Sequence, residues 1–378
     1  MRNLLALSIL AALMFSVPGT AHAVPAQCEP LTGDARADCL WADIDARLRS
    51  SATPSVTPRP TPSATSSISP TSMPPAGGWL SGASGAEAAS GTFAAWRGSP
   101  VEIIGTWLND PAVYPFGPDM SGCDDCGRLR NWRGAVDVGI SPATWRGWQA
   151  EANGGNDSFW RNTARNLRAA RVGDATTYIR PYYEFNGDWF PYSVTKGQES
   201  TFKQAWERTA SIIRAEFPEA KVLLGVAAAG GGNRIKISDA YPASPDGLSI
   251  DFYNEWAFCS THACFDQKIH HGAGAHNSLE PLRQLAQAKG DPIIISEWAN
   301  AGRVRPVSSG GGGEAPEFLE AFHGWLTRNA GTGPGQITAE VYFNIGNYDA
   351  RFELYVREQV TPVMPQTAAR YRELFGTG

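Results

Sequence analysis

Hydrophobic residues occur in short, nearly continuous runs that alternate with segments of helical periodicity. Runs such as KVLLGVA and DPIIISEW are typical of parallel strands buried on both faces. The clearest amphipathic helices are predicted at Phe202–Phe217, Leu279–Lys289 and Glu314–Thr327. Strands are predicted at Trp79–Leu80, Val101–Trp107, Ala135–Ile140, Thr177–Glu184, Lys221–Ala227, Leu248–Asn254, Pro292–Trp298 and Glu340–Asn344. Eight strands alternating with helices predict an α/β fold, the (β/α)8 TIM barrel; without the weak first strand, a doubly wound sheet is the alternative.

The pattern changes before residue 78. Residues 51–77 are rich in Ser, Thr and Pro and predict an extended linker, and residues 24–50 predict a short helical segment, too small to fold alone. Residues 1–23 resemble an export signal, with Arg2 before the apolar run Leu4–Phe15 and a small-x-small site ending at Ala23. That run is too short to span a bilayer. We expect a secreted protein with a catalytic barrel over residues 78–378.

The six cysteines form three close pairs: Cys28 with Cys39, Cys123 with Cys126, and Cys259 with Cys264. In an oxidising compartment such pairs indicate local disulfides. The second pair, Cys123 with Cys126, is also a CxxC, but it lies in a Gly/Pro-rich loop rather than at the start of a helix, which disfavours a redox centre. The three histidines between Lys268 and His276 fit no common metal-ligand spacing. We therefore expect neither a metal nor a cofactor.

Charge and aromatic content narrow the class of partner. The net charge is −5 and no basic cluster with interleaved aromatic residues occurs, which disfavours nucleic acid. No later segment is long and apolar enough to predict a membrane span. The chain has 13 Trp, 11 Tyr and 16 Phe, more than a core usually needs. Most are expected in the core, and exposed ones suit the apolar faces of sugars. We expect a monomer that binds a polysaccharide or oligosaccharide.

Two predicted strands end in glutamate, Glu184 on the fourth and Glu297 on the seventh. In a (β/α)8 barrel, chemistry occurs at the carboxyl ends of the strands. Taken singly, each glutamate is equally well interpreted as a structural ion-pair partner. Taken together, they suit glycoside cleavage, which needs one protonated carboxyl and one ionised carboxylate.

Neighbouring residues fit the same hypothesis. On a regular strand Arg180, Tyr182 and Glu184 share one face, which places Arg180 where it can orient Glu297; a buried structural charge is the alternative. Asn186 is a candidate for binding sugar hydroxyls and Trp189 for stacking on a sugar ring. Trp107, at the end of the second strand, suits a distal sugar site or the core.

Three motifs carry a resemblance to a known family. The segment RPYYEFNGDWFPY (residues 180–192) resembles the acid/base motif of glycoside hydrolase family 26, the β-mannanase family of the retaining (β/α)8 clan. PIIISEW (292–298) resembles its nucleophile motif, and DGLSIDFYNEW (246–256) its sixth strand. The resemblance implies Glu184 as acid/base, Glu297 as nucleophile and Tyr253 as a hydrogen-bond donor to it. Trp256 and Trp298 follow as supporting or substrate-binding residues.

The chain departs from the family pattern at two positions. Tyr183 precedes the acid/base where the family usually has His, and Trp298 follows the nucleophile where Phe-Gly is more usual. Both departures concern the choice of sugar more than the hydrolysis. The resulting hypothesis is a secreted, endo-acting, retaining β-glycoside hydrolase, with β-1,4-mannan as the first substrate. The alternatives are the same barrel acting on xylan, β-glucan or a cell-wall glycan, and a non-catalytic carbohydrate-binding protein.

Overall fold

A computed structural model describes residues 78–108, 132–142, 144–228, 235–255, 257–272, 276–304, 312–346, 350–357 and 362–376. They all belong to the second of two compact units, Met73–Gly378. The predicted export signal, N-terminal segment and linker lie outside the described residues, and so does Trp256.

The three predicted cysteine pairs have different outcomes. Cys259 and Cys264 form the predicted disulfide, with Cα atoms 5.5 Å apart. The other four cysteines lie outside the described residues: Cys28, Cys39, Cys123 and Cys126. The disulfides expected between Cys28 and Cys39 and between Cys123 and Cys126 therefore stay predictions.

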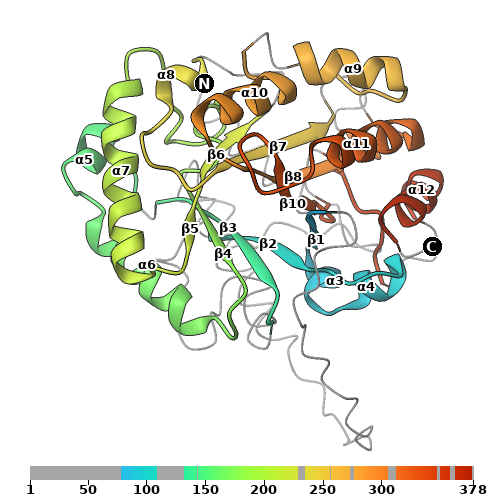
Figure 1. The fold of residues 1–378 in the computed structure, drawn as a ribbon, viewed down its shortest axis with the longest axis horizontal. Coiled ribbons are helices and arrows are strands. Elements are labelled where there is room, and N and C mark those ends of the chain that lie inside the picture. The colour runs from blue at the N-terminus through green and yellow to red at the C-terminus, as the bar shows by residue number, and fades with distance from the viewer. Residues whose placement is uncertain are drawn as a thin grey trace, which may run out of the picture. The chain divides into compact units, whose positions relative to one another are not determined.

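Strands and helices alternate along the described chain (Figure 1). The strands are β1 (Leu80–Ser84), β2 (Ile103–Leu108), β3 (Ala135–Ile140), β4 (Thr177–Pro181), β5 (Lys221–Val222), β6 (Leu224–Ala227), β7 (Leu248–Asn254), β8 (Ile293–Asn300), β9 (Arg303–Val304), β10 (Ile337–Tyr342) and β11 (Ala350–Arg351). The helices are α3 (Ala86–Ala89), α4 (Thr92–Arg97), α5 (Trp148–Ala152), α6 (Asp157–Ala170), α7 (Glu199–Glu216), α8 (Ile237–Ala240), α9 (His262–His271), α10 (Leu279–Lys289), α11 (Pro316–Asn329) and α12 (Pro365–Phe375).

The main sheet closes on itself. Its order is β5-β4-β3-β2-β1-β10-β8-β7-β6, and its two ends, β5 and β6, are separated only by Leu223. The amide of Leu223 donates to Ile179 on the β4 side, and the amide of Leu224 donates to Gly247 beside β7. The predicted strand Lys221–Ala227 therefore joins both edges. The described sheet is a (β/α)8 barrel, and because β1 pairs in parallel with both β10 and β2, the doubly wound alternative is wrong.

Most predicted elements are confirmed, with shifts at their ends. β3, β7 and α10 have the predicted bounds, and α10 ends where Gly290 adopts a left-handed φ of 89°. The first strand extends beyond its predicted two residues. The strand predicted at Thr177–Glu184 instead stops at Pro181, so Glu184 lies beyond the strand and not on it.

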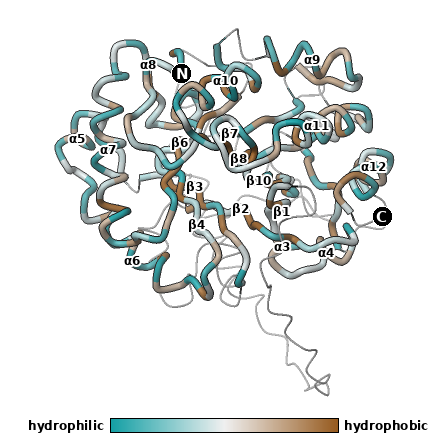
Figure 2. The backbone as a smooth tube through the Cα atoms, viewed as in Figure 1, coloured by the Kyte–Doolittle hydropathy of each residue, from teal (hydrophilic) through white to brown (hydrophobic). Residues whose placement is uncertain are grey.

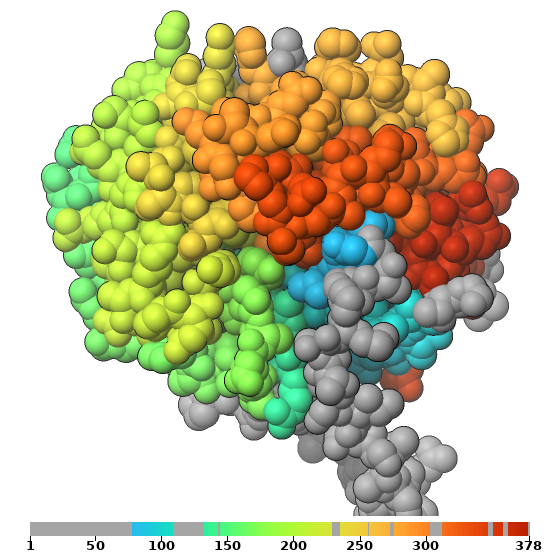
Figure 3. Space-filling view, viewed as in Figure 1, coloured from blue at the N-terminus to red at the C-terminus, as the bar shows by residue number. Residues whose placement is uncertain are grey.

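Helix periodicity explains how the outer layer packs. The buried residues of α7 recur at spacings of three or four, which gives the helix one apolar face toward the strands: Phe202, Ala205, Trp206, Thr209, Ala210 and Ile213. Figure 2 shows hydrophobic positions gathered at the central strands and mixed hydropathy along the surrounding helices. Figure 3 shows successive segments following one another around the surface, from green through yellow and orange to red. No helix among the described residues is both long and apolar enough to traverse a bilayer.

The buried apolar residues form two clusters, one inside the barrel and one between the strands and the helices. The small inner cluster consists of strand residues and Leu223: Ile103, Ala135, Tyr178, Leu223, Ile294, Ala339 and Val341. The large outer cluster contains most of the aromatic residues, including Trp160, Trp206 and Trp325. The expectation that most aromatic side chains serve the core is therefore confirmed. Trp189, 46% exposed, is the large hydrophobic side chain that stands out on the described surface.

Candidate active site

Glu297 faces the barrel interior because β8 is irregular. Ile293 and Ile295 pack in the outer cluster and Ile294 in the inner one, so simple alternation would turn Glu297 outward. The pairing of β7 with β8 shifts between Ile250↔Ile295 and Asp251↔Glu297, which inserts one extra residue. Such a bulge restarts the alternation. Glu297 therefore points inward and Trp298 points outward.

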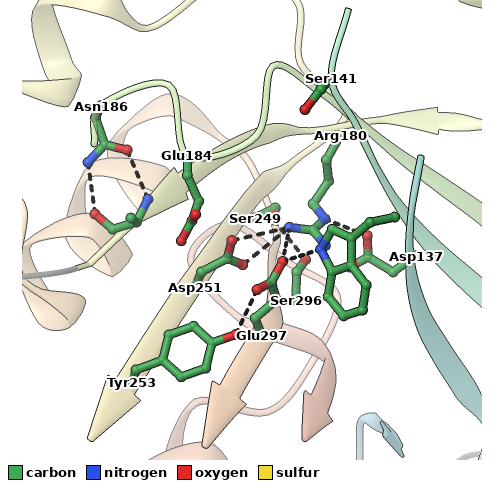
Figure 4. Close-up of polar contacts among 12 residues, drawn as sticks. Asp137, Ser141, Arg180, Glu184, Asn186, Ser249, Asp251, Tyr253, Ser296 and Glu297 are labelled. Carbon is green, nitrogen blue, oxygen red and sulfur yellow. Dashed lines mark hydrogen bonds and ion pairs between the residues drawn. The ribbon is translucent and has the colours of Figure 1, made fainter. Parts of the chain in front are cut away.

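Three donors hold the Glu297 carboxylate (Figure 4). Arg180 Nη1 donates to Oε1 at 3.0 Å, and Tyr253 Oη donates to Oε2 at 2.7 Å. The indole Nε1 of Trp107 also donates to Oε1, at 2.6 Å. Glu297 is only 5% exposed, and its carboxylate accepts hydrogen bonds from one cation and two neutral donors. The expected contacts of Arg180 and Tyr253 with this carboxylate are present.

Arg180 is the centre of a fully buried charge cluster. Its Nε donates to Asp137 Oδ1 at 2.7 Å, and its Nη1 lies 3.2 Å from Asp251 Oδ2. Burial disfavours the guanidinium charge, but the three carboxylates outweigh it and raise the pKa of Arg180 well above its ordinary value. Burial, followed by the charge of Glu297, raises the pKa of Asp251 well above its usual range. The cluster thus contains one permanent cation among three acidic groups.

Glu184 lies in a tight turn after β4. Tyr182 and Glu184 adopt left-handed φ values of 55° and 53°, which are uncommon for residues other than glycine. The amide of Glu184 donates to Gly225, and Asn186 pairs with both backbone groups of Ala227 at 2.8 and 2.9 Å. These contacts fasten the turn to β6. Asn186 is buried and its side-chain amide is engaged with the backbone, so the expectation that it binds sugar hydroxyls is not supported by its position.

The same backbone turn separates residues that a regular strand would align. Tyr182 faces outward, where its hydroxyl donates to Glu151 Oε2 at 2.6 Å and accepts from Trp160. The expected common face of Arg180, Tyr182 and Glu184 is therefore wrong for Tyr182. Tyr183 takes the inward place instead, with its ring 5.4 Å from the guanidinium carbon of Arg180.

Gly139 and Gly225 make room for Tyr183 at the floor of the site. A Cβ on Gly139 would lie 3.1 Å from the Tyr183 ring, and one on Gly225 would lie 3.1 Å from the Cβ of Tyr183. Burial raises the pKa of Tyr183 well above its ordinary value, so its hydroxyl stays protonated. A neutral ring with a hydroxyl thus stands where the family pattern has an imidazole.

Glu184 and Glu297 have contrasting surroundings. Burial, and then the charge of Glu297, raise the pKa of Glu184 to about 8, although the indole of Trp189 donates to its Oε2 at 2.8 Å. Glu184, Asp251 and Glu297 each offer a carboxylate oxygen within 4.8 Å of the other two. Such oxygens are potential cation ligands, and the guanidinium of Arg180 already supplies positive charge to two of these groups. Glu184 therefore favours its protonated form, whereas Glu297 is the carboxyl group that accepts from Arg180.

The two remaining candidates, Trp298 and Trp256, have different outcomes. Trp298 is fully buried on the outer face of β8, packs on Phe322 and donates its indole N–H to Glu340. It therefore supports the helix layer, and its expected place in the substrate site is not supported. Trp256 cannot be placed, because it lies outside the described residues.

Asp137 and Asp251 were not predicted as site residues, and the contact of Trp107 with Glu297 was not predicted either. Asp251 stands two residues before Tyr253 on β7, so period-two alternation already places them on one face. Asp137 interrupts the apolar run of β3, a signal that the pattern contained. Trp107 is not at a distal site, because its indole bonds Glu297 directly.

A (β/α)8 barrel with one carboxyl group in the turn after β4 and a second on β8, whose oxygens approach each other, defines the class of structure. No protein-family model matches the chain. It is 25% identical over 319 residues to Endoglucanase H of Acetivibrio thermocellus, a match that covers 80% of this chain. The chain spans only 30% of that relative's length.

Solved structures with the same barrel include glycoside hydrolases. A modular endo-β-1,4-mannanase of family 26 from Cellulomonas fimi superposes with a TM-score of 0.50 at 16% identity, covering 73% of this chain and 63% of that one. GH26C from a Muricauda species superposes with a TM-score of 0.54 at 14% identity, covering 78% and 84%. The resemblance indicated by the motifs therefore holds at the level of the fold.

Proposed function

We propose that the protein is an endo-acting, retaining β-glycoside hydrolase with Glu184 as acid/base and Glu297 as nucleophile. The observation that carries this proposal is the pair of carboxylate oxygens within 4.8 Å of each other in opposite electrostatic settings. Retaining enzymes hold their carboxyl groups about 5–5.5 Å apart, whereas inverting enzymes leave a gap of roughly 6.5–9.5 Å for a water molecule. The short separation favours direct attack by a carboxylate.

The reaction follows from these settings. Glu184, with its pKa raised to about 8, gives its proton to the glycosidic oxygen as the bond to the anomeric carbon breaks. An oxygen of Glu297 bonds to that carbon and forms a covalent glycosyl-enzyme. Glu184, now ionised, takes a proton from water, whose oxygen attacks the same carbon and releases Glu297. Trp189 is exposed and donates a hydrogen bond to Glu184, and its ring offers a surface on which a sugar can stack.

Substitution of the two glutamates tests the roles. Glu297→Ala and Glu184→Ala are each expected to lose most activity while unfolding at temperatures close to wild type. Azide is expected to restore turnover of an activated aryl glycoside by Glu297→Ala and to yield a glycosyl azide of inverted configuration. Wild-type rates in either variant on the true substrate would refute the assignment.

The substrate that we propose first is β-1,4-mannan, because the motifs around Glu184 and Glu297 resemble those of family 26. β-Glucan is the second candidate, since the curated relative is named an endoglucanase and Tyr183 departs from the mannanase pattern. Reducing-sugar release from mannan, β-glucan and xylan separates these candidates. Tight polysaccharide binding without turnover would instead indicate the non-catalytic alternative.

We further propose that the protein is exported. Residues 1–23 have the pattern of an export signal, and the described barrel contains the disulfide between Cys259 and Cys264. Disulfides persist in oxidising compartments outside the cytoplasm. Fractionation of producing cells, with mass spectrometry of the mature N-terminus, tests this. Uncleaved protein retained in the cytoplasm would contradict it.

A further inference from the structure

Trp107 is the least expected contact of the candidate nucleophile. It stands near the end of β2, half-buried, and its Nε1 donates to Glu297 Oε1 at 2.6 Å. The same oxygen accepts from Arg180 Nη1 at 3.0 Å. Oε2 accepts from the Tyr253 hydroxyl at 2.7 Å. Within the described part of the chain the two oxygens of Glu297 are therefore unequal, with an indole and a guanidinium on one and a phenol on the other.

The barrel fixes the direction of the Trp107 indole. Trp107 pairs in register with Gly139 on β3, and a Cβ at Gly139 would lie 2.7 Å from Trp107 Cδ1. The ring therefore occupies space that any side chain on Gly139 would take. Phe343 also packs against the indole in a T-shaped arrangement, with ring centroids 5.3 Å apart. An indole confined in this way holds its N–H in one place, which a mobile side chain does not.

We propose that Trp107 is a positioning residue that orients the Glu297 carboxylate, so that Oε2 is the atom that attacks the anomeric carbon. This inference rests on the proposed function. Trp107 and Arg180 together hold Oε1, whereas Oε2 accepts from the Tyr253 hydroxyl. In the glycosylation step the Oε2–carbon bond forms, the bond from carbon to the leaving oxygen breaks, and the proton of Glu184 passes to that oxygen. Trp107 itself makes and breaks no covalent bond.

A second indole in the site provides a matched control. Trp189 donates its N–H to the other carboxyl group, at Glu184 Oε2. Trp107→Phe and Trp189→Phe each remove one N–H and keep a ring, but they affect different partners. A general disturbance of the site would change both variants alike, whereas a specific role of each N–H predicts different effects on the pH profile.

The first experiment compares kcat/KM against pH for wild type and both variants on an aryl glycoside of the preferred sugar. Trp107→Phe is expected to lower the maximum at least tenfold, because the Glu297 carboxylate is no longer held in the orientation for attack. Its alkaline limb should stay in place. Trp189→Phe is expected to move the alkaline limb upward instead. A Trp107→Phe profile that overlies wild type would overturn the proposal, even with Glu297→Ala inactive.

The second experiment detects the hydrogen bond without turnover. In ¹⁵N-indole NMR of the full chain, the Trp107 signal is identified as the one missing from Trp107→Phe. It is expected to move in Glu297→Gln and to stay in place in Glu184→Gln, whereas the Trp189 signal should do the reverse. If the Trp107 signal stays in place in Glu297→Gln, the proposed hydrogen bond between Trp107 and Glu297 is wrong. If the signal responds but no glycan is cleaved, the positioning contact stands and the proposed function fails.

Discussion

Glu340 provides a quantitative test of how a buried carboxyl group makes the stability of this fold depend on pH. It lies on β10, fully buried on the outer side of the barrel, and accepts from the Ser81 hydroxyl and the Trp298 indole. Arg97 Nη1 in turn donates to Ser81 at 3.0 Å. Burial raises the pKa of Glu340 from 4.5 to about 7, although these donors oppose the rise. The carboxyl group therefore keeps its proton more tightly in the folded protein than in the unfolded chain.

The consequence for stability has a definite sign and size. A rise of the pKa from 4.5 to about 7 corresponds to roughly 3 kcal/mol of pH-dependent stability. Because the folded protein binds the proton more tightly, this contribution is fully present below pH 4.5. It is lost as the pH rises through about 7. Between pH 5 and pH 8.5 the loss amounts to about 2–3 kcal/mol.

The substitution Glu340→Gln removes the titration. At pH 5 the variant should be less stable than wild type, because its amide group presents N–H where a donor from Ser81 or Trp298 now points. By pH 8.5 that deficit should shrink by about 2–3 kcal/mol, since only wild type has lost stability through this group. Urea unfolding of both proteins between pH 5 and 8.5 measures the difference. The exposed Glu317→Gln serves as a control and should follow wild type throughout. Parallel curves for wild type and Glu340→Gln would refute the reasoning.

Three further predictions concern the site. Wild-type kcat/KM should fall above about pH 8, where Glu184 loses its proton. Glu184→Gln, assayed with an activated leaving group, should lack this alkaline limb, and a wild-type profile still flat at pH 9.5 would contradict the acid role. Arg180→Met should destabilise the fold by about 3–5 kcal/mol at pH 8 and by less at pH 5, where the buried carboxyl groups of Asp137 and Asp251 take up protons. Equal losses of unfolding free energy at both pH values, measured with urea, would argue against the charge cluster. Gly139→Ala should cost about 1–3 kcal/mol and reduce kcat by displacing Trp107; unchanged kinetics would show that the indole has room to move.

The sequence by itself determined the architecture and the pair of acidic residues. The buried parallel strands read as apolar runs and the covering helices as amphipathic repeats, and both patterns depend on local periodicity. This is why β3, β7 and α10 were predicted with their observed bounds. Glu184 and Glu297 were identified because each is a charged residue at the end of an apolar run, and together they form the pair that glycoside cleavage needs.

Only the tertiary structure decided how these residues face one another. Period-two alternation predicted a common face for Arg180, Tyr182 and Glu184, but the left-handed turn at Tyr182 and Glu184 turned Tyr182 outward. The bulge in β8 brought Glu297 inward and sent Trp298 to the helix layer. Bulges and left-handed turns are settled by hydrogen bonds to neighbouring strands, and those partners are distant in sequence.

The same reason explains why the contact between Trp107 and Glu297 could not be predicted from the sequence. Its indole meets Glu297 across 190 positions of the chain, a contact that no local pattern of either segment contains. It depends on Gly139 leaving space on the strand between β2 and β4, and on closure of the barrel to bring β8 opposite. Local sequence therefore selected the two carboxyl groups, and barrel closure selected the donors that distinguish them.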